Sequence, residues 1–309
     1  MRIINNGKDI VLADFANFDL KESLECGQCF NFVRTDDCTD NSFCAYKIIA
    51  GGRVLFASQR NSDLTLYDTS MEDYEAFWSN YFDVDTDYGE IKKSIIEACP
   101  ELEEVIKENP GIRLLNQEYF ETLISFIISQ NKQIPQIKAV VRQLSEMAGK
   151  KIDSDVARLR KLKVVNQDNI IMTSYCFPTL EEFSKLTEDD IRACKAGFRA
   201  PYIMDAVRRT VYGEITEDSF MGLSTDEARQ LLMKIKGVGE KVANCVLLFG
   251  LGRREAFPVD VWMKRIMEDI YFHADTPKDK IEAFATERFG KYAGYAQQYL
   301  FIYGKNKLK

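Results

Sequence analysis

Residues 231–250 carry the strongest structural signal in this chain: Leu231-Leu-Met-Lys-Ile-Lys-Gly-Val-Gly-Glu-Lys-Val-Ala-Asn-Cys-Val-Leu-Leu-Phe-Gly250. The pattern predicts two amphipathic helices joined at Lys236-Gly-Val-Gly239, because the glycines let the backbone turn sharply and let another backbone come close. The second helix would begin at this turn, with its unpaired N–H groups pointing outward. Such a helical hairpin, over about residues 225–250, can bind phosphate without basic side chains. The same pattern also fits an ordinary helical hairpin that binds nothing.

Two charged residues stand close to this hairpin in the sequence. Lys241 falls in the first turn of the second expected helix, and Pro258-Val-Asp260 begins another helix further on. A lysine amine near a carboxylate can attack a sugar C1′ and form a Schiff base, provided that the amine is partly deprotonated. Taken singly, Lys241 is equally compatible with a solvated surface lysine and Asp260 with a plain helix N-cap.

Outward from the hairpin, the chain divides into a β-rich and a helical part. Helical spacing of apolar residues dominates from Tyr88 onward, and Ser224-Thr-Asp-Glu227 fits a capping box before a helix. Gly51-Gly52 is a hairpin turn signal between two strands. The β-rich runs are Phe30–Val33, Cys44–Ile49 and Arg53–Ala57. We therefore predict an α+β fold, with a small antiparallel sheet followed by a helical body.

Composition and charge exclude several classes of protein. The chain has 309 residues, of which 46 % are hydrophobic, enough for a substantial core. It shows no signal peptide and no apolar run long enough for a membrane span, and its 8 cysteines are scattered as reduced thiols would be. We therefore expect a cytoplasmic protein. The net charge of −7 argues against a nucleic-acid binder with a broad basic footprint, and it predicts weak, salt-sensitive non-specific binding.

The segment Gly237–Cys245, followed by Phe257–Val261, resembles the helix-hairpin-helix-Gly-Pro-Asp signature of DNA glycosylases. Within that superfamily, Lys241 followed by Cys245 is similar to the 8-oxoguanine DNA glycosylase branch. Further blocks match that branch in the same order along the chain, namely Cys26–Phe30, Ser129–Ile134, Gly197–Ala200 and Ala293–Phe301.

The resemblance implies a fold and an activity. Residues 1–115 would form a TATA-binding-protein-like antiparallel sheet domain, and residues 116–309 the helical catalytic region. Lys241 would attack C1′ of a flipped 8-oxoguanine nucleotide, expel the base and promote β-elimination, while Asp260 stabilises the developing positive charge. The partner would be double-stranded DNA containing 8-oxoguanine, bound by a monomer with no membrane contact. The resemblance implies no required cofactor, metal or iron–sulfur cluster, and it allows a monovalent cation at the hairpin.

The resemblance also assigns roles to further residues. The Gly27 carbonyl would accept the N7–H that 8-oxoguanine has and guanine lacks. Cys245 and Phe301 would stack on the two faces of the extruded base, and Gln297 would read its edge. The remaining candidates are Asn131, Phe198, Arg199 and Gln136 at the duplex gap and the opposite base, and Gly237, Gly239, Val242 and Trp262 at the phosphates.

Three of these positions depart from the family pattern. Phe198 replaces a tyrosine, which keeps the wedge without its hydroxyl. Trp262 replaces a histidine and can donate only through its indole N–H. Gln136 stands where an arginine is expected. Because its amide could flip between donor and acceptor, we predict relaxed specificity for the base opposite the lesion.

Alternative functions remain open at this point. The iron–sulfur glycosylases need cysteine ligands after the hairpin, and no cysteine follows Cys245. An alkylpurine-type monofunctional glycosylase would keep Asp260 without needing Lys241, and a non-catalytic helix-hairpin-helix protein would need neither. The pair Cys26-Gly-Gln-Cys29 also raises the possibility of redox chemistry.

Overall fold

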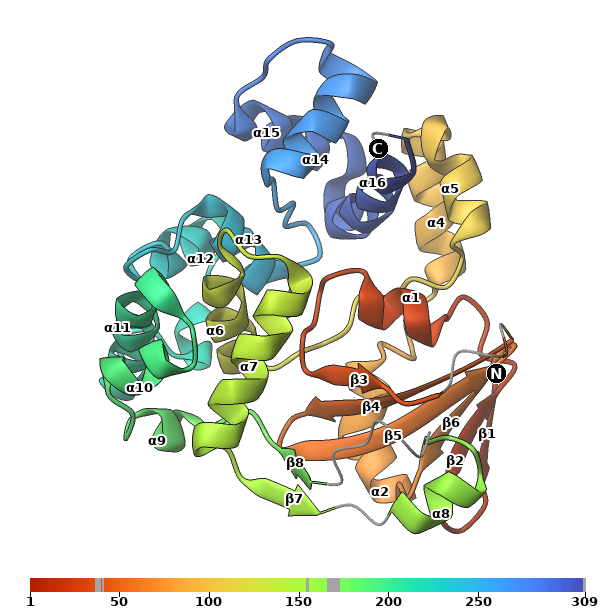
Figure 1. The fold of residues 1–309 in the computed structure, drawn as a ribbon. Coiled ribbons are helices and arrows are strands. Elements are labelled where there is room, and N and C mark those ends of the chain that lie inside the picture. Colours follow the sequence, from red (N-terminus) through yellow and green to blue (C-terminus); the bar gives the residue numbers. More distant parts are fainter. Residues whose placement is uncertain (37–39, 41, 154–155, 166–172, 308–309) are drawn as a thin grey trace.

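The computed structural model of this chain describes residues 1–36, 40, 42–153, 156–165 and 173–307. It confirms the predicted α+β class: an N-terminal antiparallel sheet is followed by a body of helices (Figure 1). None of the helices in the described ranges is long and apolar enough to cross a membrane. The strands are β1 Arg2–Asn5, β2 Ile10–Ala13, β3 Phe32–Arg34, β4 Phe43–Ala50, β5 Arg53–Arg60, β6 Asp63–Tyr67, β7 Lys151–Asp153 and β8 Thr173–Tyr175.

Most helices follow the sheet, and only α1 lies between its strands in sequence. The α-helices are α1 Leu20–Glu25, α2 Met71–Asp73, α3 Ser79–Tyr81, α4 Tyr88–Ala98, α5 Glu103–Glu108, α6 Tyr119–Ser129, α7 Ile134–Ala148, α8 Val156–Lys161, α9 Leu180–Phe183, α10 Glu188–Ala193, α11 Ala200–Val211, α12 Thr225–Leu232, α13 Glu240–Phe249, α14 Val261–Met267, α15 Lys278–Phe289 and α16 Ala293–Lys307. Short 3₁₀ or π turns are η1 Tyr74–Trp78, η2 Pro100–Leu102, η3 Gly197–Arg199, η4 Glu217–Phe220, η5 Glu268–Phe272 and η6 Gly290–Tyr292.

The six strands β1 to β6 form one antiparallel sheet in the order β1-β2-β6-β5-β4-β3. Gly51 and Gly52 connect β4 to β5, with Ala50 opposite Arg53, which confirms the predicted hairpin. Both glycines have positive φ, 56° and 67°, the conformation that a two-residue type I′ turn requires at both positions. One face of the sheet packs over α1 and the segment from Tyr74 to Val84.

The helical body is built around two almost fully buried helices. Every residue of α13 from Val242 to Phe249 is buried, and eight of the eleven residues of α6 are buried. These two helices pack against each other, and α12 and α7 cover them from outside. The chemistry expected at the start of α13 is therefore attached to the buried centre of the helical body.

The two buried cores are not continuous in sequence, and the predicted domains 1–115 and 116–309 stay a prediction. α4 and α5 pack into the core of the helical body beside α16, so the first core ends near Val84. Leu115 then returns to the core of the sheet. The segment before residue 115 therefore crosses between the two cores before the chain enters α6.

A strap of the helical body reaches back to the sheet. We use this name for β7, α8 and β8 with the residues Leu162–Val165. Leu159, Val164 and Val165 bury the face of the sheet opposite α1, and the Thr35 hydroxyl donates to the Val164 carbonyl at 2.8 Å.

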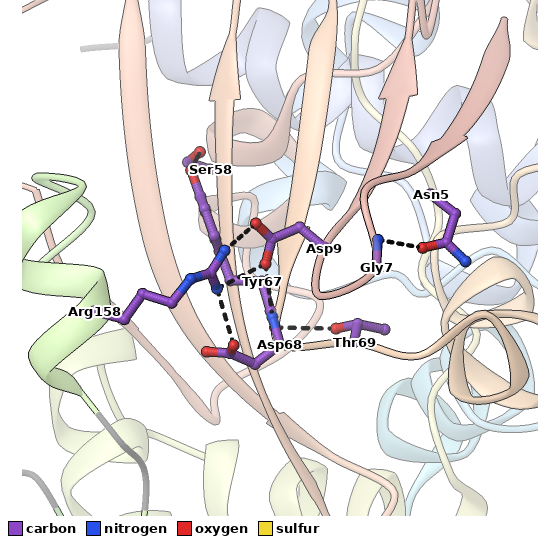
Figure 2. Close-up of polar contacts among 8 residues, drawn as sticks. All are labelled: Asn5, Gly7, Asp9, Ser58, Tyr67, Asp68, Thr69 and Arg158. Carbon is purple, nitrogen blue, oxygen red and sulfur yellow. Dashed lines mark hydrogen bonds and ion pairs between the residues drawn. The ribbon is translucent and has the colours of Figure 1, made fainter.

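One arginine fastens the strap to the sheet (Figure 2). Arg158 of α8 donates through Nη1 to Asp9 at 2.8 Å and to Asp68 at 2.9 Å, and through Nη2 to Asp9. Burial favours protonation of Asp9, but hydrogen bonds from Arg158 and from the Asp68 backbone N–H outweigh it and lower the pKa of Asp9. The strap thus joins the two halves of the fold by a charged contact as well as by packing.

Candidate active site

The predicted helical hairpin is present as α12 and α13. The Ser224 side chain caps α12, as predicted, and Gly239 is the N-cap of α13. The first intrahelical bond of α13 runs from the Ala243 N–H to the Gly239 carbonyl, at 2.9 Å. The backbone N–H groups of residues 240–242 therefore precede the helical ladder and are available to an anion at the helix start.

The turn of the hairpin is fixed against α11. Gly237 has φ +78°, and a Cβ at this position would lie 2.2 Å from the Tyr202 ring, so no other residue fits without movement of that ring. The Lys236 N–H donates to Asp205 at 2.8 Å, and Arg209 holds the same carboxylate at 2.9 Å. The exposed backbone of Gly237 and Gly239 is thus held in place by contacts of the turn with α11.

Lys241 lies in the first turn of α13, where the sequence placed it. Its amine donates to the Ser129 hydroxyl at 3.5 Å and lies 5.2 Å from the centroid of the Phe126 ring. Both partners belong to α6. Burial raises the pKa of the Cys245 thiol, the neighbouring Lys241 ammonium lowers it, and the Asp260 carboxylate raises it again. Lys241 and Asp260 therefore both lie within electrostatic reach of the Cys245 thiol.

Asp260 begins α14 as predicted. Its Oδ1 accepts the Met263 N–H at 2.7 Å, the geometry of an N-cap. The residues before it, Phe257 to Val259, are buried, and Asp260 itself is half-buried. One carboxylate oxygen is thus used to cap α14, which fixes the side chain and leaves the second oxygen to face charge in the site.

Gly27 lies just after α1 in a rigid segment of backbone. It has φ +90°, a conformation that favours glycine. The next residue, Gln28, is fully buried. Its amide group donates to the carbonyls of Ser23 and Arg113, both at 2.7 Å, and accepts the Leu115 N–H at 2.8 Å. Gln28 was not among the predicted site residues, because its only signal in the sequence is a polar residue between two cysteines.

The two cysteines beside Gly27 are unsuited to redox chemistry. Both are free thiols, and they donate to the Ser23 and Leu24 carbonyls. Burial raises the pKa of Cys26 to about 12 and raises that of Cys29 well above its usual range. Because the reactive species is the thiolate, the redox alternative lacks its nucleophile at neutral pH.

The candidates for base stacking and base reading lie on two helices, α13 and α16. Cys245 on α13 and Gln297 on α16 are buried, with 3 % and 8 % of their surfaces exposed. The Gln297 carbonyl accepts from the Gln298 amide at 2.6 Å, and Phe301 is half-buried against the helical core. Their contacts with a base remain predictions.

The expected duplex-facing residues have different exposures. Phe198 is 49 % exposed and Asn131 lies on the surface between α6 and α7 with φ +50°, so both are free to enter a duplex. Arg199 is only 5 % exposed. It donates to the carbonyls of Gln130, at 2.8 Å from Nε, and Ala196, at 3.1 Å, and its guanidinium lies 4.2 Å from the Phe198 ring. To read a base, Arg199 would have to leave these carbonyls.

Gln136 has a structural task that the sequence analysis did not foresee. Its carbonyl accepts the Gln133 N–H at 3.1 Å, which completes a capping box at the start of α7. The side-chain oxygen is therefore engaged in this capping bond, so the amide cannot flip to offer a base its acceptor in place of its donor. Only its NH₂ group faces outward from this exposed side chain.

The two remaining phosphate candidates lie at helix starts. Val242 buries its side chain, with 4 % exposed, and can offer only its backbone N–H, in keeping with its predicted role. Trp262 is half-buried in the first turn of α14, two residues after Asp260. The structure thus brings Lys241, Cys245 and Asp260 together and places Gly237, Gly239 and Val242 at one helix start. The individual roles of the other candidates stay predictions.

Two family models together match almost the whole chain. The N-terminal domain of 8-oxoguanine DNA glycosylase matches residues 10–123, and the HhH-GPD superfamily of base excision DNA repair proteins matches residues 124–291. A probable N-glycosylase/DNA lyase from Methanothermobacter thermautotrophicus is 31 % identical over 204 residues, which cover 63 % of this chain and 64 % of the relative. This chain spans 56–64 % of the length of three curated relatives that it matches.

Solved structures resemble the fold over its full length. MBOgg1 in complex with a low-affinity DNA ligand has a TM-score of 0.89 and 38 % identity, covering 100 % of this chain and 99 % of that chain. The 8-oxoguanine glycosylase/lyase of Clostridium acetobutylicum, in complex with DNA that has cytosine opposite 8-oxoguanine, has a TM-score of 0.88 and 36 % identity, with the same coverage. Sequence, fold and the position of Lys241 agree: the chain belongs to the 8-oxoguanine DNA glycosylase branch of the HhH-GPD superfamily.

Proposed function

We propose that this chain is a bifunctional DNA glycosylase/AP lyase that flips 8-oxoguanine out of duplex DNA and excises it. The observation that carries the proposal is the placement of Lys241, whose amine lies in the first turn of α13 and interacts with the Cys245 thiol, on which the Asp260 carboxylate also acts. A purely DNA-binding hairpin has no use for a lysine and a carboxylate around one buried thiol. The DNA-bound relatives described above support double-stranded DNA as the partner.

The chemistry follows from the amine and the carboxylate. The Lys241 Nζ lone pair forms a bond to C1′ as the C1′–N9 bond breaks, and the electron pair leaves with the base, which takes up a proton. The positive charge that develops on the sugar is stabilised by Asp260, fixed by its cap bond to Met263. Loss of an amine proton and ring opening give a Schiff base, whose C2′ proton is then removed as the 3′ phosphate leaves. Water finally hydrolyses the Schiff base and releases Lys241 as a free amine.

A borohydride experiment separates this reaction from the alkylpurine alternative. Reduction of the Schiff base joins the protein covalently to an 8-oxoguanine duplex, whereas a monofunctional glycosylase would excise the base without being trapped. Base release without a trapped complex would support the monofunctional mechanism, and neither product would support a non-catalytic DNA-binding protein.

No metal or iron–sulfur cluster takes part in the proposed reaction, because Lys241 itself supplies the nucleophile. We further propose a monomer that works in the cytoplasm, where the free thiols of the described part of the chain would stay reduced. A monovalent cation at the hairpin turn would be bound by backbone carbonyls and would leave the chemistry unchanged.

Gly27→Ala is expected to weaken binding to an 8-oxoguanine duplex by about 5- to 30-fold, the equivalent of ~1–2 kcal/mol, because the added side chain at this positive φ would shift the Gly27 carbonyl away from the base. The Cβ would also meet the Ile134 Cδ1 at 3.4 Å. Binding is measured with the Lys241→Gln variant, to prevent turnover. The control is Gly213→Ala, which has a similar φ of +72° and no atom within 4 Å of the added Cβ. An equal loss of binding to an abasic duplex would contradict a role in base reading.

Gln136→Arg is expected to create a preference for cytosine opposite the lesion of about 10- to 150-fold, the value of one bidentate contact. In the unmodified chain, Gln136 offers only an NH₂ group, so we expect small differences among the four opposite bases. The measurement is single-turnover excision on four duplexes that differ only in that base.

Gln136→Glu is the matched control for this prediction, because glutamate keeps the capping box of α7 and has no donor for cytosine. A cytosine-over-adenine ratio above roughly 100 in the unmodified chain would mean that another side chain reads the opposite base.

A further inference from the structure

Two surface turns of the helical body are joined by one arginine. The first turn, Gln130–Gln133, connects α6 to α7 and presents Asn131 to solvent. The second turn, Lys195–Arg199, connects α10 to α11 and presents Phe198, which is 49 % exposed. We call them the gap turn and the wedge turn. Arg199 ends the wedge turn and, unlike its neighbour Phe198, is turned inward.

The contacts of Arg199 reach both turns. Its Nε donates to the Gln130 carbonyl of the gap turn at 2.8 Å, and its Nη2 donates to the same oxygen. Its Nη1 donates to the Ala196 carbonyl of the wedge turn at 3.1 Å, and its guanidinium lies 4.2 Å from the centroid of the Phe198 ring. One side chain thus holds the backbone just before Asn131 and packs on the ring of Phe198.

Arg199 lies beside another cation and is held without a carboxylate. Burial lowers the pKa of Arg199, and burial and the Arg199 charge both lower the pKa of Lys132 in the gap turn. No carboxylate of the described residues contributes to either shift. The position of Arg199 therefore depends on its hydrogen bonds to the two carbonyls, which the fixed fork of a guanidinium can make at once.

Both turns contain backbone that needs such support. Asn131 has φ +50° and Lys195 has φ +63°, a conformation that residues other than glycine adopt at a cost and keep only where their surroundings fix it. Arg192 of α10 donates to the Gly197 carbonyl at 3.3 Å and so fastens the wedge turn to its own helix. Every hydrogen bond that links the two turns within the described ranges comes from Arg199.

We propose that Arg199 is a positioning residue that fixes the spacing between Phe198 and Asn131, and that it does not read the base opposite the lesion. The inference rests on the proposed function, in which these two side chains enter the duplex together. A reading role would require Arg199 to leave both carbonyls, and an acceptor without its partner is costly. Since the Gln136 oxygen is also engaged, the opposite base would have no fixed reader among these side chains.

The link between the turns is tested first in the free protein, by amide hydrogen exchange. Arg199→Met keeps an apolar side chain of similar length and should speed exchange in both turns about tenfold or more, the value of a lost hydrogen bond to a charged group. Arg253→Met is the matched control, because that guanidinium donates to the Phe220 and Leu223 carbonyls, at 3.3 and 2.9 Å, near the start of α12. Unchanged exchange in the two turns of Arg199→Met would overturn the proposal.

Single-turnover excision then separates a positioning role from a reading role. Arg199→Met should slow excision about 10- to 100-fold, the range expected for a displaced reacting geometry, and by the same factor opposite all four bases. Loss of a reader would instead fall mainly on one base pair, by about 10- to 150-fold. A loss more than about threefold greater opposite cytosine than opposite adenine would therefore refute the positioning role.

Arg199→Lys tests whether charge alone is sufficient. Lysine keeps the positive charge, but its single amine cannot reproduce the fork that meets both carbonyls, so we expect a loss similar to that of Arg199→Met. Excision by Arg199→Lys at the rate of the unmodified chain would assign the effect to charge and would contradict the proposal.

A further background shows whether Arg199 acts through the two exposed side chains. Phe198→Ala combined with Asn131→Gly removes both, and glycine accepts the φ of 50°. In this background Arg199→Met should add less than about threefold to the loss of rate, because nothing remains to be positioned. A full additional loss would indicate a general structural role and would count against the proposal.

Failure of this inference can be told apart from failure of the proposed function. If the unmodified chain does not excise 8-oxoguanine, the proposed function is wrong, while the exchange experiment still reports on the link between the turns. If the unmodified chain excises the base and Arg199→Met does so at the same rate, only the role of Arg199 is refuted.

Discussion

Lys241→Gln is expected to abolish base excision and Schiff-base trapping while the chain still folds and binds an 8-oxoguanine duplex. Loss of a covalent nucleophile costs on the order of 10⁴-fold or more in rate. Folding should be little affected, because the amine makes a long bond of 3.5 Å to the Ser129 hydroxyl and otherwise interacts with the Cys245 thiol. Duplex binding should persist, because the phosphate contacts of the hairpin are made by the backbone at the start of α13.

The measurements are single-turnover excision, borohydride trapping and duplex affinity on the same preparation. Lys185→Gln serves as the charge control, since that exposed lysine pairs only with Glu181 on α9. Excision by Lys241→Gln at a rate near that of the unmodified chain would show that another group attacks C1′, or that water does.

Local turn chemistry explains which parts of the fold could be predicted from the sequence. Gly51-Gly52 requires positive φ at two adjacent positions, and Ser224 and Asp260 cap their helices through bonds to residues only three positions away. These features depend on short stretches of chain, so periodicity and capping rules identify them. The strands β1, β2 and β6 have only four or five residues each, which is too few for a clear alternation of apolar and polar residues in the sequence.

Long-range contacts explain what could not be predicted. Arg158 meets Asp9 across 149 positions of sequence, and Gln28 meets Arg113 across 85. No periodic pattern records such pairs, so the strap and the anchoring of Gly27 appear only in the structure. Gln136 and Arg199 show a related difficulty: a motif names the residue, but the bond to Gln133 or the Gln130 carbonyl decides which of its atoms are available.

In the candidate site, too, some proximities follow from sequence spacing and others do not. Lys241 and Cys245 are one helical turn apart on α13, so their proximity follows from sequence spacing. Asp260 acts on the same thiol from a different helix, α14, and the family resemblance, not the spacing, indicated this proximity.

Asp260→Asn is expected to slow excision about 10²- to 10³-fold, the usual loss when one charge-stabilising group is removed from an active site. Stability should hardly change. Asparagine caps a helix about as well as aspartate, so the bond to the Met263 N–H at 2.7 Å can be kept by the amide oxygen. What is lost is the negative charge, and with it the stabilisation of the positive charge on the sugar as the base leaves. Lesion binding should be retained, because that charge develops only during the reaction.

Two further variants separate charge from capping. Asp260→Ala removes both, so it should match the rate of Asp260→Asn and also lose about 0.5–2 kcal/mol of stability. Ser224→Ala removes the cap of α12, where the hydroxyl accepts the Glu227 N–H at 3.3 Å, and should lose similar stability with excision intact. Rates are measured by single turnover and stability by thermal unfolding. If Asp260→Asn unfolds many degrees earlier but excises at the original rate, Asp260 is only a helix cap, and the positive charge on the sugar must be stabilised by another group.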